Sequence, residues 1–168
     1  KKVLLKEGAR ADEALANCRA ILADESRDII GQGSQGSRAQ WYIQGHIGST
    51  WKDGKYYRTR VMKYVKPAFE DLLRRLQTDY IDLGMIHYVD SEEEREKIQH
   101  SDYLDYVMEL KKTGTLRHIG ISSHNPKVAV KAAQSGYVEM ILFSINPAFD
   151  MLPASEDIET MFAEQYDT

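Results

Sequence analysis

The chain has 168 residues, enough for one domain with a hydrophobic core, and 42% hydrophobic with 29% charged residues is an ordinary globular composition. Its net charge of −4 gives no electrostatic reason to expect nucleic acid as a partner. No apolar run approaches the roughly 18 residues of a membrane span. The single cysteine, Cys18, cannot form an internal disulfide, so we expect a reducing, cytoplasmic location and no membrane association.

Residues 1–40 have the least definite pattern in the chain. Apolar residues at helical spacing predict a helix within residues 1–30: Ala14, Leu15, Cys18, Ile21 and Leu22. The glycine-rich run GQGSQGS, residues 31–37, lacks the GxGxxG spacing of a phosphate loop, and no clear strand precedes it. The run therefore predicts a flexible surface connection.

Short apolar runs alternate with helical patterns between residues 41 and 144. The runs predict strands at residues 41–46, 80–86, 116–122 and 138–144, with helices at 66–76, 102–112 and 126–135. A polar excursion turning at Asp53–Gly54 and an acidic surface run, SEEERE, are expected between them. This alternation predicts parallel strand–helix units, in a barrel or in an open sheet.

The number of predicted strands is too small for a closed barrel. A complete eight-stranded barrel takes about 250 residues, and about four strands are predicted here. A parallel sheet also needs cover on both faces. We therefore expect the sequence to be part of a larger protein.

Three histidines follow predicted strands at their carboxyl ends, where the active sites of parallel barrels are built: His46, His87 and His124. His87 stands directly after the strand at 80–86, although a histidine buried at a strand end is the simpler interpretation. Barrel-mouth histidines can bind zinc, as in a metal-dependent hydrolase. Because no HxH or HExxH spacing is present, we expect no metal site.

Three motifs in order resemble the aldo/keto reductase family: LRRLQTDYIDLGMIHYVD, LKKTGTLRHIGISSHNP and ILFSINPAFD. The resemblance spans about residues 26–150. It implies a partial (β/α)8 TIM-type barrel forming a single domain over residues 1–168, with the strand–helix units at 41–144 and a tail at 145–168. The runs QGHIGS, SINPAF and MLPASED are similar to a bacterial branch that often carries a C-terminal iron–sulfur extension. One cysteine cannot supply four thiolates, so a cluster is expected only in a longer parent chain.

The resemblance implies reduction of a small carbonyl compound, such as an aldehyde, ketone or quinone, by a nicotinamide cofactor, usually NADPH. In the family a Tyr donates a proton, a Lys paired with an Asp assists it, and a His orients the carbonyl. His87 matches the family His, and His46 stands at the position of the Lys. Asp24 could imitate the Asp, but no Tyr follows it. These departures favour, as the alternative, a non-catalytic barrel that binds a cofactor or a partner.

The resemblance also implies cofactor-binding residues. Ser122 and Ser123 correspond to the family's Ser-Asn pair, which holds the nicotinamide carboxamide, so Ser123 is a departure. Asn146 matches a family Asn, whereas Leu142 replaces a Gln that would bind the amide. The sequence carries no signal for the oligomeric state.

Overall fold

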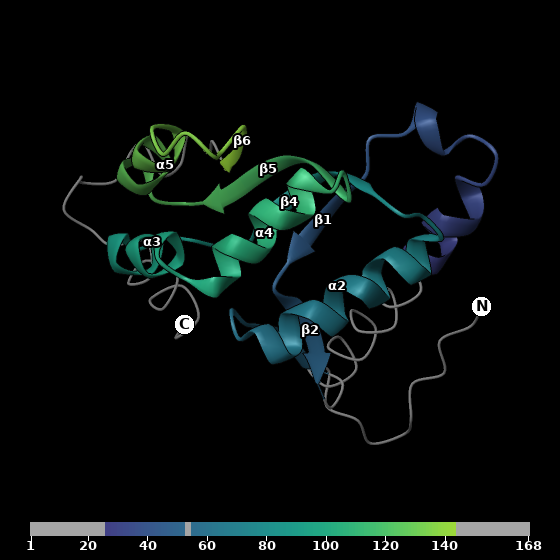
Figure 1. Cartoon of the computed structure of the whole chain (residues 1–168), viewed down its shortest axis with the longest axis horizontal. Helices are drawn as coiled ribbons and strands as arrows, with labels where there is room; N and C mark the ends of the chain where they lie inside the picture. Colours follow the sequence, from purple (N-terminus) through teal and green to yellow (C-terminus); the bar gives the residue numbers. More distant parts are fainter. Residues whose placement is uncertain (1–25, 53–54, 144–168) are drawn as a thin grey trace, which may run out of the picture.

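The structure is a computed structural model that describes residues 26–52 and 55–143 (Figure 1). Residues 26–33 are helical and lead into a short 3₁₀ helix. The elements that follow, in chain order, are η1 (Arg38–Gln40), β1 (Gln44–Ile47), β2 (Ser49–Lys52), β3 (Lys55–Arg58), α2 (Met62–Leu76), β4 (Ile81–Ile86), α3 (Glu92–Gln99), α4 (Asp102–Lys112), β5 (Leu116–Ser123), α5 (Pro126–Ala133) and β6 (Met140–Phe143).

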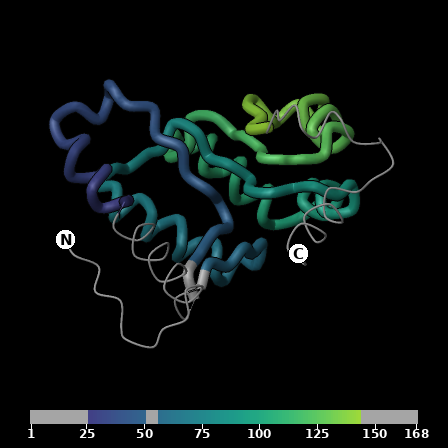
Figure 2. Tube along the Cα trace, turned by 180° about the vertical axis from the view of Figure 1, so that it is seen from behind, coloured from purple at the N-terminus to yellow at the C-terminus, as the bar shows by residue number. Residues whose placement is uncertain are grey.

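Four of the strands form one parallel sheet in the order β1-β4-β5-β6. Helices α2, α4 and α5 contact these strands from one side: α2 contacts β1, α4 contacts β5, and α5 contacts β5 and β6. Figure 1 shows α2 and α4 in front of the strands, and Figure 2, from behind, shows the strands in front. The predicted parallel strand–helix units are confirmed, and they form part of a barrel wall.

Alternate residues of each strand pack against the helices. Ile47, Ile86 and Ile121 belong to the hydrophobic core between sheet and helices, and they are neighbours in the register. Successive side chains of a strand point to opposite faces. The residues before and after these isoleucines therefore lie on the other face, where the chemistry-bearing side chains are found.

Helix α2 begins one turn earlier than predicted. The sequence predicted a start at residue 66 with Pro67 in the first turn, whereas the helix begins at Met62 with Pro67 inside it. Its buried residues are Val65, Phe69, Leu72 and Leu76, which recur at helical spacing. Because Val65 belongs to this buried face, the helix begins before it. Pro67 is tolerated because it is exposed, so water can bind the carbonyl that loses its partner.

Two further predictions were wrong in the same region. The strand predicted from Trp41 begins only at Gln44, and Trp41 and Tyr42 are exposed. The polar excursion after it is an antiparallel hairpin, β2–β3, with Ser49 opposite Arg58. The hairpin lacks an alternating apolar face, which is the usual sequence signal for a strand.

The acidic run and the glycine-rich run also belong to ordered structure. SEEERE opens α3, whose N-cap Ser91 accepts a hydrogen bond from the backbone N–H of Glu94 at 3.1 Å. Its first turn holds three glutamates, which the helix dipole favours. The predicted flexible connection at 31–37 begins in a helical turn, and Gly31 fits so closely against the backbone of Arg75 and Leu76 that a Cβ would collide with it.

Helix α4 has both of its predicted ends, and helix α5 has the predicted start but ends at Ala133, two residues early. Helix α4 runs from Asp102 to Lys112 as predicted, and Gly114 follows it with φ +80°. Helix α5 begins at Pro126, and the Asn125 side chain caps it by accepting from the N–H groups of Lys127 and Val128.

Gly48 turns the chain from β1 into the hairpin. Its φ is +92°, and a Cβ there would collide with the backbone oxygen of Thr59. We expect Gly48→Ala to lower the free energy of unfolding by about 2–3 kcal/mol, because it combines a left-handed backbone with a clash. The control is Gly114→Ala, where φ is +80° and nothing lies within 4 Å; only the backbone cost of about 1 kcal/mol is expected there. Urea unfolding measures the free energy of unfolding of both variants. Equal losses in the two variants would contradict the clash at residue 48.

Candidate active site

Two histidines stack on each other at the carboxyl end of the sheet. His46 is paired in register with Met85, so His87, two residues further along, lies on the same face and beside His46. Their ring centroids are 4.0 Å apart with an interplanar angle of 12°. The fold therefore brings together the two residues that the sequence assigned to catalysis.

A serine on the next strand fixes the orientation of the His87 ring. Ile121 pairs with Ile86, so Ser122 lies beside His87. Ser122 Oγ is 3.2 Å from His87 Nδ1 and accepts a 2.6 Å hydrogen bond from the Tyr88 backbone N–H. If the Ser122 hydroxyl donates its one hydrogen to Nδ1, the His87 proton lies on Nε2, and this is the tautomer that we assign. The free ring nitrogen of His87 is then a hydrogen-bond donor.

Both histidines are held in the neutral form. The pKa of His87 is lowered to about 4, mainly by burial and then by the nearby His46, Arg60, Arg58 and His124, in that order. Burial, followed by the charge of Arg27, also lowers the pKa of His46. At neutral pH His46 therefore cannot supply the permanent positive charge of a lysine.

The hairpin is fastened to the loop after β4 by two arginines. Arg60 Nη2 donates to the His87 carbonyl at 2.6 Å, and Arg58 donates to the Tyr88 carbonyl. Both arginines also pair with Glu94 of α3, at 3.6 Å for Arg58 and 3.3 Å for Arg60. These contacts place two cations beside the histidine pair.

Tyr88 has a backbone conformation that bulky residues rarely adopt. Its φ is +59°, and such left-handed residues are found at functional sites where the surroundings hold them. Here the Ser122 hydroxyl binds the Tyr88 N–H, and Arg58 binds its carbonyl and lies 4.9 Å above its ring. The strained residue directly follows His87, so these contacts also fix the position of the imidazole.

Ser123 and His124 serve a second cluster, around Asp90. Ser123 Oγ donates to Asp90 Oδ1 at 3.2 Å, and the His124 backbone N–H donates to the same oxygen at 2.6 Å. His124 Nδ1 lies 3.0 Å from Asp90 Oδ2. Asn125 Nδ2 donates to the Asp90 carbonyl at 3.0 Å. This cluster ties the end of β5 to the loop after β4 and leaves Ser123 only 1% exposed.

The sequence did not assign Tyr56 to the site, although the hairpin brings it there. Its ring meets His87 edge-on, with centroids 6.2 Å apart and an interplanar angle of 84°. Its hydroxyl lies 2.6 Å from Ser49 Oγ. A turn at Asp53–Gly54 flanked by aromatic residues was the available signal, since such a dipeptide often joins two antiparallel strands. Asn146, which is predicted to bind the cofactor, lies outside the described residues. The same holds for Asp24, the possible counterpart of the family Asp.

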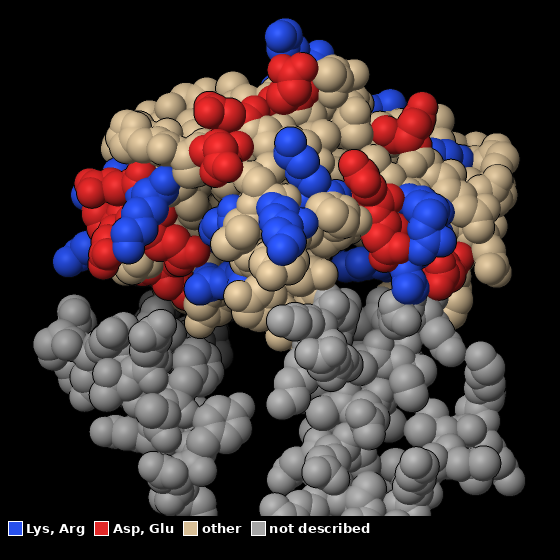
Figure 3. Space-filling model, turned by 60° about the horizontal axis from the view of Figure 1, so that its bottom comes forward, with Lys and Arg blue, Asp and Glu red and all other residues tan. Residues whose placement is uncertain are grey.

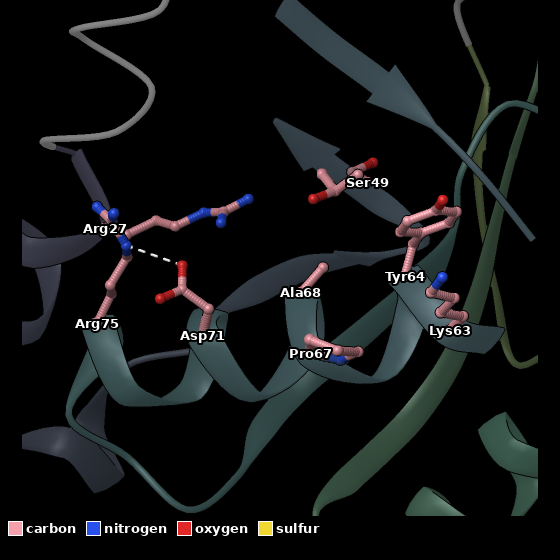
Figure 4. A pocket seen from close by; sticks show the side chains of 9 residues that line it. Arg27, Ser49, Lys63, Tyr64, Pro67, Ala68, Asp71 and Arg75 are labelled. Atoms are coloured by element: carbon pink, nitrogen blue, oxygen red, sulfur yellow. Dashed lines mark hydrogen bonds and ion pairs between the residues drawn. The ribbon is translucent and has the colours of Figure 1, made fainter. Parts of the chain in front are cut away.

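A polar hollow of about 320 Å³ opens between helix α2 and the hairpin. Figure 4 shows Tyr64, Ala68, Asp71 and Arg75 on α2, with Ser49 of β2 opposite them and Arg27 at the far end. Asp71 pairs with Arg75 at 2.9 Å across its floor. Strand β2 of the hairpin forms one wall of the hollow. Its residue Ser49 lines the hollow and also contacts the Tyr56 hydroxyl.

The three strand-end histidines do not converge. His46 and His87 stack, while His124 pairs with Asp90. Among residues 26–52 and 55–143, no group of three His, Cys, Asp or Glu side chains is arranged to hold a metal ion. In the same ranges, no helix has the length and apolar character to cross a membrane. On the face shown in Figure 3, acidic and basic side chains are interspersed.

Comparison with known proteins agrees with this fold. The profile described as the aldo/keto reductase family matches residues 25–166. The uncharacterized oxidoreductase YqkF of Bacillus subtilis is 30% identical over 138 residues, covering 80% of this chain and 43% of YqkF. The aldo-keto reductase YhdN of the same species is 29% identical over 101 residues, covering 59% of this chain and 29% of YhdN.

A solved structure supports the same relationship. The holo form of aldo-keto reductase AKR11C1 from Bacillus halodurans superimposes with a TM-score of 0.58 and 28% identity, covering 71% of this chain and 39% of that one. The chain spans less than half the length of these relatives.

Parallel strand–helix units with polar side chains at the carboxyl ends of the strands define part of a TIM-type barrel. The chain belongs to the aldo/keto reductase family.

The pKa values of the two histidines predict how stability depends on pH. Between the ordinary value of about 6.5 and the His87 value of about 4, the unfolded chain binds protons that the folded chain does not. Stability therefore falls as the pH is lowered through this window, and the lowered pKa of His46 acts in the same direction.

We expect His87→Gln to flatten this part of the profile, measured by urea unfolding at pH 4 to 7. The matched control is His100→Gln, an exposed histidine after α3. An unchanged slope in His87→Gln would contradict the buried, neutral state of His87.

Proposed function

We propose that the protein containing this chain reduces a carbonyl compound with a nicotinamide cofactor, and that His87 Nε2–H donates a hydrogen bond to the carbonyl oxygen. The observation that carries the proposal is the 3.2 Å contact between Ser122 Oγ and His87 Nδ1, in which we assign Ser122 as the donor and so place the His87 proton on Nε2. Such a fixed donor stabilises the negative charge that develops on the oxygen as hydride arrives. The low pKa of His87, about 4, keeps this neutral form at physiological pH.

Membership of the family supports the use of a nicotinamide cofactor, and the family resemblance favours NADPH. The cofactor supplies the hydride. Ser122 fits its carboxamide, because the hydroxyl oxygen has two lone pairs and only one is used by the Tyr88 N–H. Ser123 fits poorly, because its hydroxyl already donates to Asp90 and accepts from the Asn125 backbone N–H. Ser122 and Asn146 are therefore the residues that we propose to hold the carboxamide.

The substrate class that we propose is a small aldehyde, ketone or quinone. A neutral hydrogen-bond donor at His87 suits a carbonyl oxygen. The direct test is NADPH consumption by the full-length parent protein with representatives of all three classes. Turnover of at least one supports the proposal, and binding of NADPH without any turnover contradicts it.

The second candidate is a barrel that binds the cofactor without catalysis. Two observations favour it. His46 replaces the family lysine and has a lowered pKa, and the half-exposed Leu142, opposite Ser122 in the register, cannot bind an amide. Calorimetry separates the candidates, because a non-catalytic barrel binds NADPH tightly yet leaves every carbonyl unreduced.

A further inference from the structure

We propose that the phenol of Tyr56, carried by the β2–β3 hairpin, donates the proton to the carbonyl oxygen. This inference rests on the proposed carbonyl reduction, and it assigns the general acid that the sequence does not provide at the family's own position. The observation that carries the inference is the edge-on contact between the rings of Tyr56, in strand β3, and His87, which follows β4. The two ring centroids are 6.2 Å apart.

The Tyr56 side chain is held in place by two contacts. Its hydroxyl lies 2.6 Å from Ser49 Oγ on the neighbouring strand, and Ser49 is itself buried. Its ring edge rests on His87. A general acid must lie within hydrogen-bond reach of the oxygen that it protonates. A carbonyl oxygen bound to His87 Nε2 would lie beside the ring that Tyr56 contacts. We propose that this oxygen also accepts a hydrogen bond from the Tyr56 phenol.

Two arginines attach the hairpin to the backbone of His87 and Tyr88, beside the proposed site of proton transfer. Arg58, two residues after Tyr56 on the same strand face, donates to the Tyr88 carbonyl. Arg60 donates to the His87 carbonyl at 2.6 Å. These two cations lie close enough to lower the pKa of His87.

The other nearby groups are less suited to give a proton. His87 is neutral at physiological pH, and Ser122 already binds His87 Nδ1 and the Tyr88 N–H. The Tyr88 ring also meets the His87 ring, with centroids 6.1 Å apart, but it lies against Arg58 and 5.0 Å from the His124 ring, next to the second cluster. Tyr56 is 46% exposed, so both a substrate and water can reach it.

The proton transfer completes a balanced reduction. The carbonyl carbon accepts a hydride, with two electrons, from the reduced nicotinamide, which is oxidised. The Tyr56 O–H bond breaks as the new O–H bond of the alcohol forms. The phenolate then recovers a proton from water, directly or through the Ser49 hydroxyl.

Two measurements on the full-length parent protein test the proposal. The first is the infrared C=O stretch of carbonyl-¹³C acetophenone bound without cofactor. A phenol hydrogen bond lowers this frequency, so we expect it to return toward the solution value in Tyr56→Phe and to stay low in Tyr57→Phe. Tyr57 is the matched control, because it is the next residue of the same strand, on its opposite face, and 48% exposed.

The second measurement is kcat for NADPH-dependent carbonyl reduction. General acids contribute about 10²–10⁴-fold, so we expect Tyr56→Phe to lower kcat by about 100-fold, with unchanged NADPH affinity. Tyr57→Phe should stay within about threefold, and Tyr88→Phe is measured beside it as the test of the other tyrosine that contacts His87. Calorimetric NADPH affinity and circular dichroism check that each variant is folded.

The outcomes separate this proposal from the proposed function. Wild-type turnover with an active Tyr56→Phe, or with Tyr88→Phe as the inactive variant, overturns the role of Tyr56 and leaves carbonyl reduction standing. Absence of wild-type turnover overturns carbonyl reduction, and proton donation by Tyr56 with it. An infrared frequency that does not differ between wild type and Tyr56→Phe overturns the Tyr56 contact with the carbonyl in either case.

Discussion

His87→Ala is expected to lower kcat/KM for carbonyl reduction by about 100-fold or more, since a single preorganised donor to a developing oxyanion contributes about 10²–10³-fold. The expected loss is large because the donor is fixed on several sides. Ser122 holds Nδ1, the His46 ring stacks at 4.0 Å, and Arg60 holds the backbone carbonyl. A side chain held in this way does not have to be reoriented when charge develops.

The measurement is steady-state reduction of the best carbonyl substrate by the full-length parent protein, with NADPH affinity measured separately. NADPH affinity should change little, because His87 is proposed to contact the carbonyl oxygen and Ser122 the cofactor. His100→Ala is the matched control, being an exposed histidine in the same half of the chain. A His87→Ala variant that keeps a third or more of the activity would contradict the role of His87 as the donor.

Asp82→Ala is expected to lower the free energy of unfolding by about 3 kcal/mol, the range for removing one partner of a buried ion pair. The Asp82 side chain is 1% exposed and accepts from Arg38 at 2.8 Å and Arg117 at 2.9 Å. It also accepts from the Ile43 backbone N–H at 3.0 Å. Burial alone would raise the pKa of this carboxyl, but the Ile43 and arginine hydrogen bonds outweigh it and the pKa is lowered.

The loss extends beyond the carboxylate itself. The two guanidinium groups each lie 4.0 Å from the centre of the Tyr80 ring, so the aromatic ring and the aspartate hold the arginines together. Without Asp82 these cations repel each other at the amino end of β4.

Urea unfolding of Asp82→Ala measures this loss, and Asp82→Asn separates charge from volume. The asparagine can still accept from the Ile43 N–H, so an intermediate loss is expected. Asp71→Ala is the control for an exposed pair, since Asp71 bonds Arg75 on the surface of α2 and should cost less than about 1 kcal/mol. A loss below 1 kcal/mol in Asp82→Ala would show that the buried network is not stabilising.

The elements with strong local signals were predicted well. The bounds of α4 follow from its apolar face and its terminal glycine, and the start of α5 follows from Asn125 and Pro126. The hairpin β2–β3 and helix α3 were missed because they bury few apolar side chains. Their ends are fixed instead by contacts with distant residues, such as the arginine pairs with Glu94.

The candidate site shows the same division. The position of His87 after an apolar strand, within motifs that resemble a family, predicted it as a site residue, and that role stays a prediction. The role of Ser122 was predicted as cofactor binding, whereas the structure shows its hydroxyl beside His87 Nδ1. Whether Ser122 also holds a carboxamide stays a prediction, as does the role of Asn146.

The amino-acid sequence by itself determined the family of this chain, the parallel strand–helix order and the placement of His46 and His87 at the carboxyl ends of strands. These are local properties, because they depend on apolar spacing, caps and ordered motifs along the chain. Only the tertiary structure decided which groups meet at that edge. The register of β1, β4 and β5 stacks the two imidazoles beside Ser122. The hairpin then brings in Tyr56 from a segment without a periodic pattern, because its arginines bind carbonyls that lie about 30 residues away along the chain.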